Sequence, residues 1–354
     1  MQRRTFLGAA GLGLTGSLAG CTTVTSLFQT TNSREPPLVE NRPDAIYIPT
    51  HQEGMQMVGM GNAGDLKVGL MYSYAHRFWV IEPDGGDWVT KKIPLEENDS
   101  VHLMAVVWDP ETGVVVPSTD VTIELTNDDG LVYQEVVYPM FSQRMGVHYG
   151  DNVPLDGNDV YTAKITVAGV PFERFGSFEG RFEQAATAEI DFDYREGQRS
   201  DLPYKLLEDR QGNRGALPAM EMKMPQGVAP DSLPGETIGE GTTESEDVTF
   251  RAQAVTEARF GGEPYLLVSP KTRYNGYLVP GMALSATVER DGETVFDGEL
   301  KPGLDPEVGL HYGATVEGLG ADDGVTVTVD IPPQVARHEG YETAFFDIGD
   351  VTIA

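Results

Sequence analysis

Apolar and polar residues alternate over many short stretches of the chain, which is the pattern of half-buried β-strands. In VTIELTND, residues 121–128, the side chains of Val121, Ile123 and Leu125 share one face and the polar side chains share the other. The stretches VYTAKITVAGV, ATAEIDFDY and VTVTVDIP alternate in the same way, and 41 glycines and 23 prolines supply turns. No stretch carries the apolar periodicity of an amphipathic helix of three turns. The sequence therefore predicts an all-β protein.

The predicted strands fall into two regions that polar segments separate. Residues 46–194 and 247–354 are rich in alternating stretches, and we expect each region to form one domain. Residues 195–246 are rich in Pro, Gly, Ser, Thr and acidic side chains, which predicts a linker. Residues 22–45 are also polar and predict a flexible tether before the first domain.

One motif occurs in both regions. The stretches MGVHYGDNVPL, residues 145–155, and VGLHYGATVEGL, residues 308–319, share the pattern Gly-x-His-Tyr-Gly-x-x-Val. In each region a strand hairpin precedes the motif and an alternating strand follows it. About seven short strands in each copy favour a sandwich of the immunoglobulin type. The sequence therefore predicts two immunoglobulin-like β-sandwich domains that arose by internal duplication.

The first 21 residues predict export and a lipid anchor. Arg3 and Arg4 precede an apolar stretch, residues 6–19, that is too short and too rich in glycine for a spanning helix of about 20 residues. These features are typical of a twin-arginine (Tat) signal peptide. The stretch LAGC matches a lipobox, in which Cys21, the only cysteine of the chain, becomes the lipidated first residue of the mature protein. The alternative is an ordinary secretory signal followed by an incidental cysteine.

The charge balance narrows the choice of partners. The chain carries 25 Lys and Arg residues against 55 Asp and Glu residues, a formal net charge of −30. Such a surface repels nucleic acid and anionic lipid headgroups, so we expect no nucleic-acid partner. It also keeps a protein soluble in concentrated salt, where the Debye length is about 3 Å at 1 M. In these respects the chain resembles the exported proteins of halophilic archaea.

Motifs of common catalytic sites are missing from the sequence. The chain has no Gly-x-Ser-x-Gly, no His-Glu-x-x-His and no phosphate-binding loop. A cysteine nucleophile is excluded if Cys21 carries the lipid. We therefore expect a protein that is not an enzyme.

The stretch around the first motif carries a family resemblance. YPMFSQRMGVHYGDNVPL, followed by Gly-x-x-x-Tyr-x-x-x-Ile, resembles the periplasmic iron-uptake lipoprotein family, whose members are immunoglobulin-like and handle ferrous iron or copper beside a membrane iron transporter. The resemblance implies that Met140 and His148 bind a transition metal. The spacing between them is one residue longer than the family pattern, which makes Met145 a rival for the methionine position.

Two further family elements bring in more histidines. The family element Arg-His-x-Asp-x-x-Thr-Gly is similar to ARHEGYETAF in the second region, which implies that His338 and His311 form a second site. The first region reads ERFGSFEGRF, with Phe175 at the position of that histidine. A family strand that bears His and Glu is similar to MYSYAHRFWVIE, which implies His76 as a third ligand of the first site.

The residue types themselves suit a metal site. Imidazole binds Cu, Zn, Fe and Ni, and a thioether favours Cu(I). Two methionine clusters are either soft-metal ligands or adaptable packing: Met55, Met57 and Met60 near His51, and Met220, Met222 and Met224 at alternate positions. The residues alone also allow another interpretation of the repeated motif, in which its histidine is a turn residue bonded to a backbone carbonyl.

Together these features predict an extracytoplasmic lipoprotein that Cys21 anchors to the outer face of the cell membrane. We expect it to bind copper or iron and to assist uptake by a membrane iron transporter. The alternative is a non-catalytic immunoglobulin-like module that contacts envelope partners without a metal. The choice between a monomer and a homodimer is left open.

Overall fold

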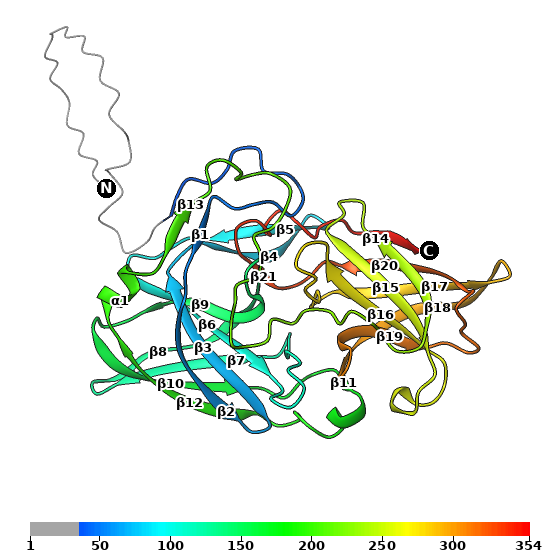
Figure 1. Cartoon of the computed structure of the whole chain (residues 1–354), viewed down its shortest axis with the longest axis horizontal. Helices are drawn as coiled ribbons and strands as arrows, with labels where there is room; N and C mark the ends of the chain where they lie inside the picture. The colour runs from blue at the N-terminus through cyan, green and yellow to red at the C-terminus, as the bar shows by residue number, and fades with distance from the viewer. Residues whose placement is uncertain (1–34) are drawn as a thin grey trace, which may run out of the picture. The chain divides into compact units, whose positions relative to one another are not determined.

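The computed structural model describes residues 35–354, and the regular structure in this range is almost entirely β-strand (Figure 1). The prediction of an all-β protein is therefore confirmed. The expected signal peptide with Cys21, and the expected tether up to residue 34, lie outside the described residues. No helix within residues 35–354 has the length and apolar character needed to cross a membrane.

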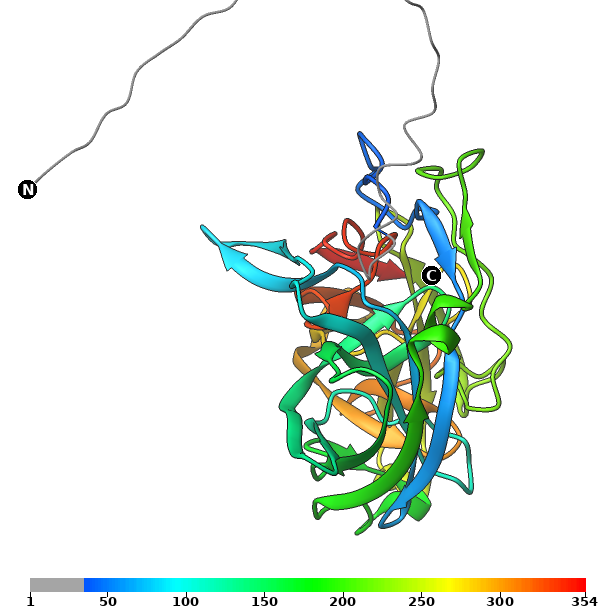
Figure 2. The same ribbon diagram turned by 90° about the vertical axis from the view of Figure 1, so that its left-hand side faces the viewer.

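The first sheet comes mainly from the first half of the chain. Its neighbouring strands follow the order β12-β10-β7-β8-β9-β6-β3-β2, and each pair along this path is antiparallel. The strands are β2 Gln56–Ala63, β3 Leu66–Tyr74, β6 Asp99–Trp108, β7 Val121–Asn127, β8 Gly130–Ser142, β9 Gly146–Pro154, β10 Asp159–Val167 and β12 Ala186–Tyr194. A hairpin of β4 (Phe78–Asp84) and β5 (Asp87–Ile93) projects from this sheet in Figure 2.

The second sheet repeats this order with strands from the second half. Written in the same direction as the first, its path is β22-β20-β17-β18-β19-β16-β15-β14, again with antiparallel neighbours. The strands are β14 Glu236–Thr242, β15 Val248–Val255, β16 Tyr265–Thr272, β17 Ala283–Arg290, β18 Glu293–Asp305, β19 Gly309–Thr315, β20 Gly324–Ile331 and β22 Asp350–Ile353. The chain therefore visits corresponding positions of the two sheets in the same sequence, with β9 matching β19.

Both sheets curl until their edge strands meet, which makes them barrel-like. In the first sheet, Gly61 of β2 lies against Ala188 of β12, so closely that a Cβ on the glycine would be 3.0 Å from the alanine Cβ. In the second sheet, the amide of Glu240 in β14 donates to the carbonyl of Ala354 at 3.2 Å, and the amide of Ala354 donates back at 3.3 Å. Side chains on the inner faces then form the core.

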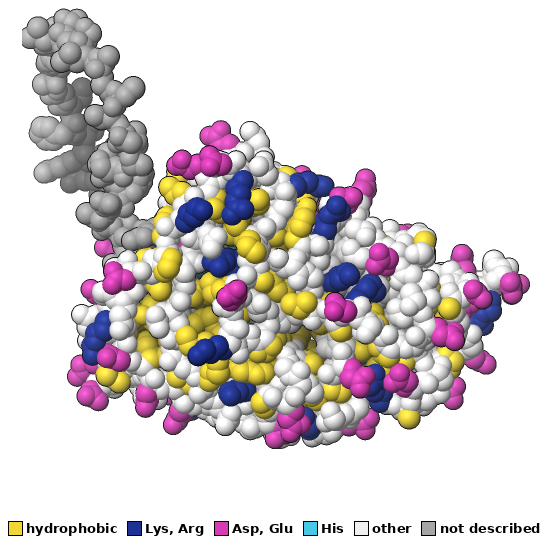
Figure 3. Space-filling model, in the orientation of Figure 1, with side chains coloured by type: hydrophobic (Ala, Val, Ile, Leu, Met, Phe, Trp, Pro, Cys, Tyr) yellow, Lys and Arg dark blue, Asp and Glu magenta, His cyan; other side chains and the backbone are white. Residues whose placement is uncertain are grey.

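The predicted alternation places apolar side chains inside. Val121, Ile123 and Leu125 on β7 are fully buried, and so are Ala163 and Ile165 opposite them on β10. Removing this apolar surface from water is the main driving force for folding. Acidic side chains remain outside, and on the face drawn in Figure 3 they are scattered widely instead of forming one patch.

The two halves exchange short strands. From the second half, β21 (Ala336–Arg337) joins the first sheet, where it runs parallel to β8 and antiparallel to β4. From the first half, β11 (Glu173–Arg174) joins the second sheet parallel to β18. Residues 35–354 accordingly belong to one compact unit.

The segment predicted as a linker contains some regular structure. It includes α1 (Glu196–Ser200), β13 (Tyr204–Leu206), which pairs with β1 (His51–Glu53), and the edge strand β14. Residues 220–224 form no strand, and Met224 is buried in the core. The three methionines of this cluster are therefore not aligned on one strand face. Two 3-10 turns complete the described structure, η2 (Gly176–Phe178) and η3 (Ala258–Phe260).

Candidate metal centre

Four histidines from separate segments converge at one end of the first sheet. His102 lies on β6 and His148 on β9, while His76 follows β3 and His338 follows β21. The ring of His338 is central: its centroid lies 4.9 Å from those of His76 and His148, and 5.2 Å from that of His102. The exchanged strand β21 is therefore what brings His338 to the first sheet.

Three of these rings direct the same nitrogen toward the centre. Each Nδ1 lies close to an acceptor oxygen, so each Nδ1 carries the hydrogen and donates it. The pairs are His76 with the Tyr74 carbonyl at 2.9 Å, His148 with the Gly146 carbonyl at 3.1 Å and His102 with the Asn152 amide oxygen at 3.0 Å. The Nε2 atoms of these three histidines are therefore left with lone pairs.

His338 cannot satisfy all of these lone pairs. Its Nε2 lies 3.0 Å from Nε2 of His148, and its Nδ1 lies 3.1 Å from Nε2 of His76. A neutral imidazole carries one N–H, so at least one of the two contacts brings lone pairs together. Burial, and then the neighbouring histidines, hold the pKa of His338 well below its usual range, so a second proton does not relieve the contact. A cation at the centre would relieve the contact, because the lone pairs would then bind the cation.

The arrangement suits a transition metal in several respects. One nitrogen each of His76, His102 and His338 lies within 4.8 Å of the others. A metal ion bound by imidazoles at about 2.0–2.1 Å draws such nitrogens to within about 4 Å of one another, so only small movements are needed. Nε2 of His102 is buried with no hydrogen-bond partner, a costly state that ligation would end. Burial also lowers the pKa of His148 to about 4, which keeps it in the neutral, ligating form.

Met140 places a thioether sulfur on the same face of the sheet as His148. It is the residue of β8 directly opposite His148 on β9, so both side chains lie on the same face of the sheet. Met140 is fully buried, as is His148. It is also opposite Ala336 in β21, two residues before His338. The rival, Met145, is buried too and lines the pocket described below.

The three residues of the His-Tyr-Gly motif have separate roles in β9. His148 faces the centre, and Tyr149 on the opposite face donates its hydroxyl to the Val116 carbonyl at 2.8 Å. Gly150 leaves room for another ligand, since a Cβ there would lie 3.1 Å from Nε2 of His102 and 2.9 Å from the Leu103 carbonyl oxygen. The motif thus lies in a strand and not in a turn, although its histidine does bond a backbone carbonyl.

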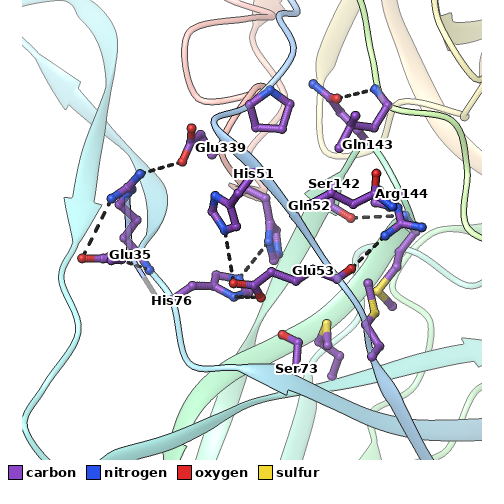
Figure 4. Close-up of a pocket in the computed structure, with 17 residues that line it drawn as sticks. Glu35, His51, Gln52, Glu53, Ser73, His76, Ser142, Gln143, Arg144 and Glu339 are labelled. Carbon is purple, nitrogen blue, oxygen red and sulfur yellow. Dashed lines mark hydrogen bonds and ion pairs between the residues drawn. The ribbon is translucent and has the colours of Figure 1, made fainter. Parts of the chain in front are cut away.

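A pocket connects the centre with the surface (Figure 4). His338, His76, Glu53 and His51 are among its lining residues, with the methionines Met55, Met104 and Met145. Its volume of about 100 Å³ has room for several water molecules, since one needs about 10–15 Å³ measured in the same way. A small hydrated ion can therefore reach His76 and His338 from this pocket.

The structure gathers most of the residues expected from sequence, but in a different grouping. His76, His148 and Met140 lie together as expected for the first site. His338, which was expected to accompany His311, lies with them instead, and His311 is in the second sheet. His102 was missed. Its signal was a lone histidine in the otherwise apolar strand VHLMAVVW, two residues before Met104 on the same strand face.

His311 occupies the corresponding position of the second sheet. It lies opposite Gly303 in the β18–β19 pair, just as His148 lies opposite Met140. Its Nδ1 lies 3.3 Å from the Gly309 carbonyl, its Nε2 is buried without a partner, and burial lowers its pKa to about 4. This histidine therefore has the orientation of His148 and one free lone pair.

The residues around His311 are aromatic where the first centre has ligands. Glu173 of β11 lies opposite Gly303, just as Ala336 of β21 lies opposite Met140. Phe175 and His338 each follow two residues later, so Phe175 is the counterpart of His338. Its ring centroid lies 5.2 Å from that of His311, close to the 4.9 Å between His338 and His148.

Tyr265 in turn is the counterpart of His102. In the first sheet, His102 lies two residues before Met104, which is opposite Gly150 of the motif. In the second sheet, Tyr265 lies two residues before Leu267, which is opposite Gly313, the corresponding glycine. The stretch AHRF, residues 75–78, also resembles EARF, residues 257–260, and this alignment places Ala258 at the position of His76. His311 is thus enclosed by carbon-rich rings.

Two segments of the chain match protein-family models. Residues 86–194, which include His102, Met140 and His148, match the family described as Fe2+ transport protein. Residues 231–354 match a domain of unknown function, DUF7350. The matched segment contains β6 to β10 and β12 of the first sheet, whereas β2 and β3 precede it. None of the curated proteins matches the chain.

Solved structures of two bacterial proteins have some similarity to this chain. FetP of uropathogenic E. coli is 20% identical, with a TM-score of 0.31, over 40% of this chain and 96% of its own. A copper-bound variant of FetP is 19% identical, with a TM-score of 0.30, over 40% of this chain and 92% of its own. A copper-bound variant of Campylobacter jejuni P19 is 19% identical, with a TM-score of 0.32, over 40% of this chain and 98% of its own.

Proposed function

We propose that this chain binds one copper or iron ion at His76, His102, His148, His338 and Met140. The observation that carries the proposal is the convergence of imidazole lone pairs on His338 in a buried site that a pocket connects with the surface. The match of residues 86–194 to an Fe2+ transport model supports iron transport as the process. A donor set of imidazoles and one thioether suits copper or Fe2+ better than it suits hard cations such as Mg²⁺.

We infer that the protein acts by binding and transfer, without catalysis. In this proposal it is a twin-arginine lipoprotein of a halophile, anchored by Cys21 outside the cell membrane, that passes its ion to a membrane iron transporter. Its two halves are immunoglobulin-like domains of one duplicated origin, a view that the common strand order and the corresponding histidines support. The second half supplies His338, while Phe175 and Tyr265 fill its own version of the site.

The direct test is the metal content of residues 22–354 after loading with Cu(I), Cu(II) or Fe(II) and removal of free ion. We expect one ion per chain in the wild type and none in H148A. The variant H311A is the matched control, because it removes the corresponding buried imidazole from the other half, and it should keep one ion. A wild type that retains no ion would leave the metal-free surface module as the better account.

A further inference from the structure

Glu53 places a carboxylate in the wall of the pocket that leads to the four histidines (Figure 4). Its Oε1 lies 3.1 Å from Nε2 of His51, and its Oε2 lies 3.5 Å from Nδ1 of His76. The side chain of Glu53 is 10% exposed and that of His51 12%. Both side chains therefore reach solvent in the same pocket that His76 and His338 line.

The charge of Glu53 has no arginine or lysine to balance it within the described residues. Arg77 pairs with Glu339 at 2.7 Å, and Arg144 donates to the main-chain carbonyl of Glu53 at 2.8 Å instead of to its carboxylate. The charged or polar side chains paired with this carboxylate are the imidazoles of His51 and His76.

His51 is held ready to bind a cation through Nε2. Its Nδ1 lies 3.0 Å from the Thr50 hydroxyl, and its ring stacks on Tyr204 with centroids 5.2 Å apart. When the Thr50 hydroxyl donates to Nδ1, the ring hydrogen is on Nε2 and bonds to Glu53. A metal cation that takes the place of this hydrogen binds the other tautomer, in which the ring hydrogen is on Nδ1 and is donated to the Thr50 hydroxyl. The cation then finds one nitrogen and one carboxylate oxygen.

His76 separates this pair from the centre. Its Nδ1 is directed to the Tyr74 carbonyl and Glu53, whereas its Nε2 faces His338. One ring therefore borders both positions, and a cation beside Glu53 has a single imidazole to pass before it reaches the buried nitrogens.

We propose that His51 and Glu53 form a capture site for an incoming transition-metal cation, which then moves past His76 into the centre. The inference rests on the proposed function of that centre. A weak site on the path inward speeds both loading and release, so it changes rates without changing the affinity of the final site.

The test is the rate of Cu(II) binding, followed by stopped-flow quenching of tryptophan fluorescence, together with the equilibrium affinity from calorimetry. Trp79, opposite Arg337 in the β4–β21 pair, lies near the centre and serves as the reporter. We expect H51A to lower the association rate constant about tenfold and to change Kd less than about twofold, because capture raises the local ion concentration. H311A should change neither quantity, and thermal melts verify that both variants are folded.

A second pair of variants isolates the charge. E53Q should lower the association rate and weaken its dependence on salt, since the carboxylate attracts the ion over the Debye length. E111Q removes an equal charge beside Arg181 and Asp65, at the far end of β3 from His76, and should leave the rate unchanged. A rate that H51A leaves unchanged, or an H51A loss confined to Kd, would overturn the capture site. Absence of binding in the wild type would instead refute the proposed function.

Discussion

Nε2 of His338 lies 3.0 Å from Nε2 of His148, although 190 residues separate them in the chain. One belongs to the last part of the second half, the other to the repeated motif of the first half. The contact exists because β21, a strand from the second half of the chain, pairs with β8 and β4 of the first sheet. The candidate metal centre is therefore shared between the two halves, and each half alone holds only part of it.

His102 should be needed for stabilisation of the protein by a metal ion. In H102L, the metal-induced rise in melting temperature should disappear, because one ligand is gone. The metal-free variant should melt near the wild-type temperature, since leucine removes a buried nitrogen without a partner, which costs about 1–3 kcal/mol, but also removes the hydrogen bond from Nδ1 to Asn152. Calorimetric melts with and without Cu or Fe measure both effects. A metal-induced rise that persists in H102L would show that His102 is not a ligand.

The thioether should set the preference for oxidation state. M140L keeps the buried volume but removes the sulfur, so we expect Cu(I) affinity to fall at least about tenfold and more than Cu(II) affinity. M145L is the comparison, because Met145 is equally buried and lines the same pocket. Competition titrations with a Cu(I) chelator decide between them. Loss of Cu(I) binding in M145L alone would assign the role to Met145.

The aromatic pocket of the second sheet should become a metal site when its ligands are supplied. F175H, Y265H and G303M together place two imidazoles and a thioether beside His311, at the positions of His338, His102 and Met140. We expect this triple variant to bind two ions per chain by metal analysis.

In the H148A background the same triple variant should bind one ion, since the new site is then the remaining one. The control F175L leaves the pocket apolar and should add no ion. A triple variant that keeps its near-ultraviolet circular dichroism and still binds one ion would contradict the correspondence between the two sites.

Buried histidines should make the metal-free protein sensitive to acid. Burial lowers the pKa of His311 to about 4 in the folded state, whereas an unfolded histidine titrates near 6.5. Between these values the unfolded state binds more protons, so the free energy of unfolding falls as the pH falls, and no further loss from this group occurs below about 4. Relative to pH 7.5, His311 alone should cost about 2–3 kcal/mol at pH 4.5.

The measurement compares urea unfolding of wild type and H311L at both pH values. The variant has its own baseline stability, so the difference between its loss and the wild-type loss isolates His311. Equal losses in the two proteins would mean that His311 is not neutral in the fold.

Local patterns predict the strands well because each strand buries one face. The alternation around Val121 and Ile123 is visible in the sequence, and both residues are fully buried in β7. The repeated motif likewise places His148 and His311 at corresponding sheet positions.

The grouping of the ligands could not be predicted in the same way. His338 follows a strand of two residues, too short for any periodicity, and its partners are set by tertiary exchange. His102 stands in an apolar strand whose neighbours say nothing of a metal. The position of Glu53 between two histidines depends on β1 pairing with β13, a contact between segments that no sequence pattern connects.

The exchange of β21 also fixes when the ion can be acquired. A ribosome makes His76, His102 and His148 long before it reaches His338, so the nascent first half offers an incomplete set of ligands. The full set forms only after the second half has been made and has folded around β21. In the proposed function, metal loading is thereby a late event in the life of the chain, and the ion comes from the compartment in which the two halves finish folding.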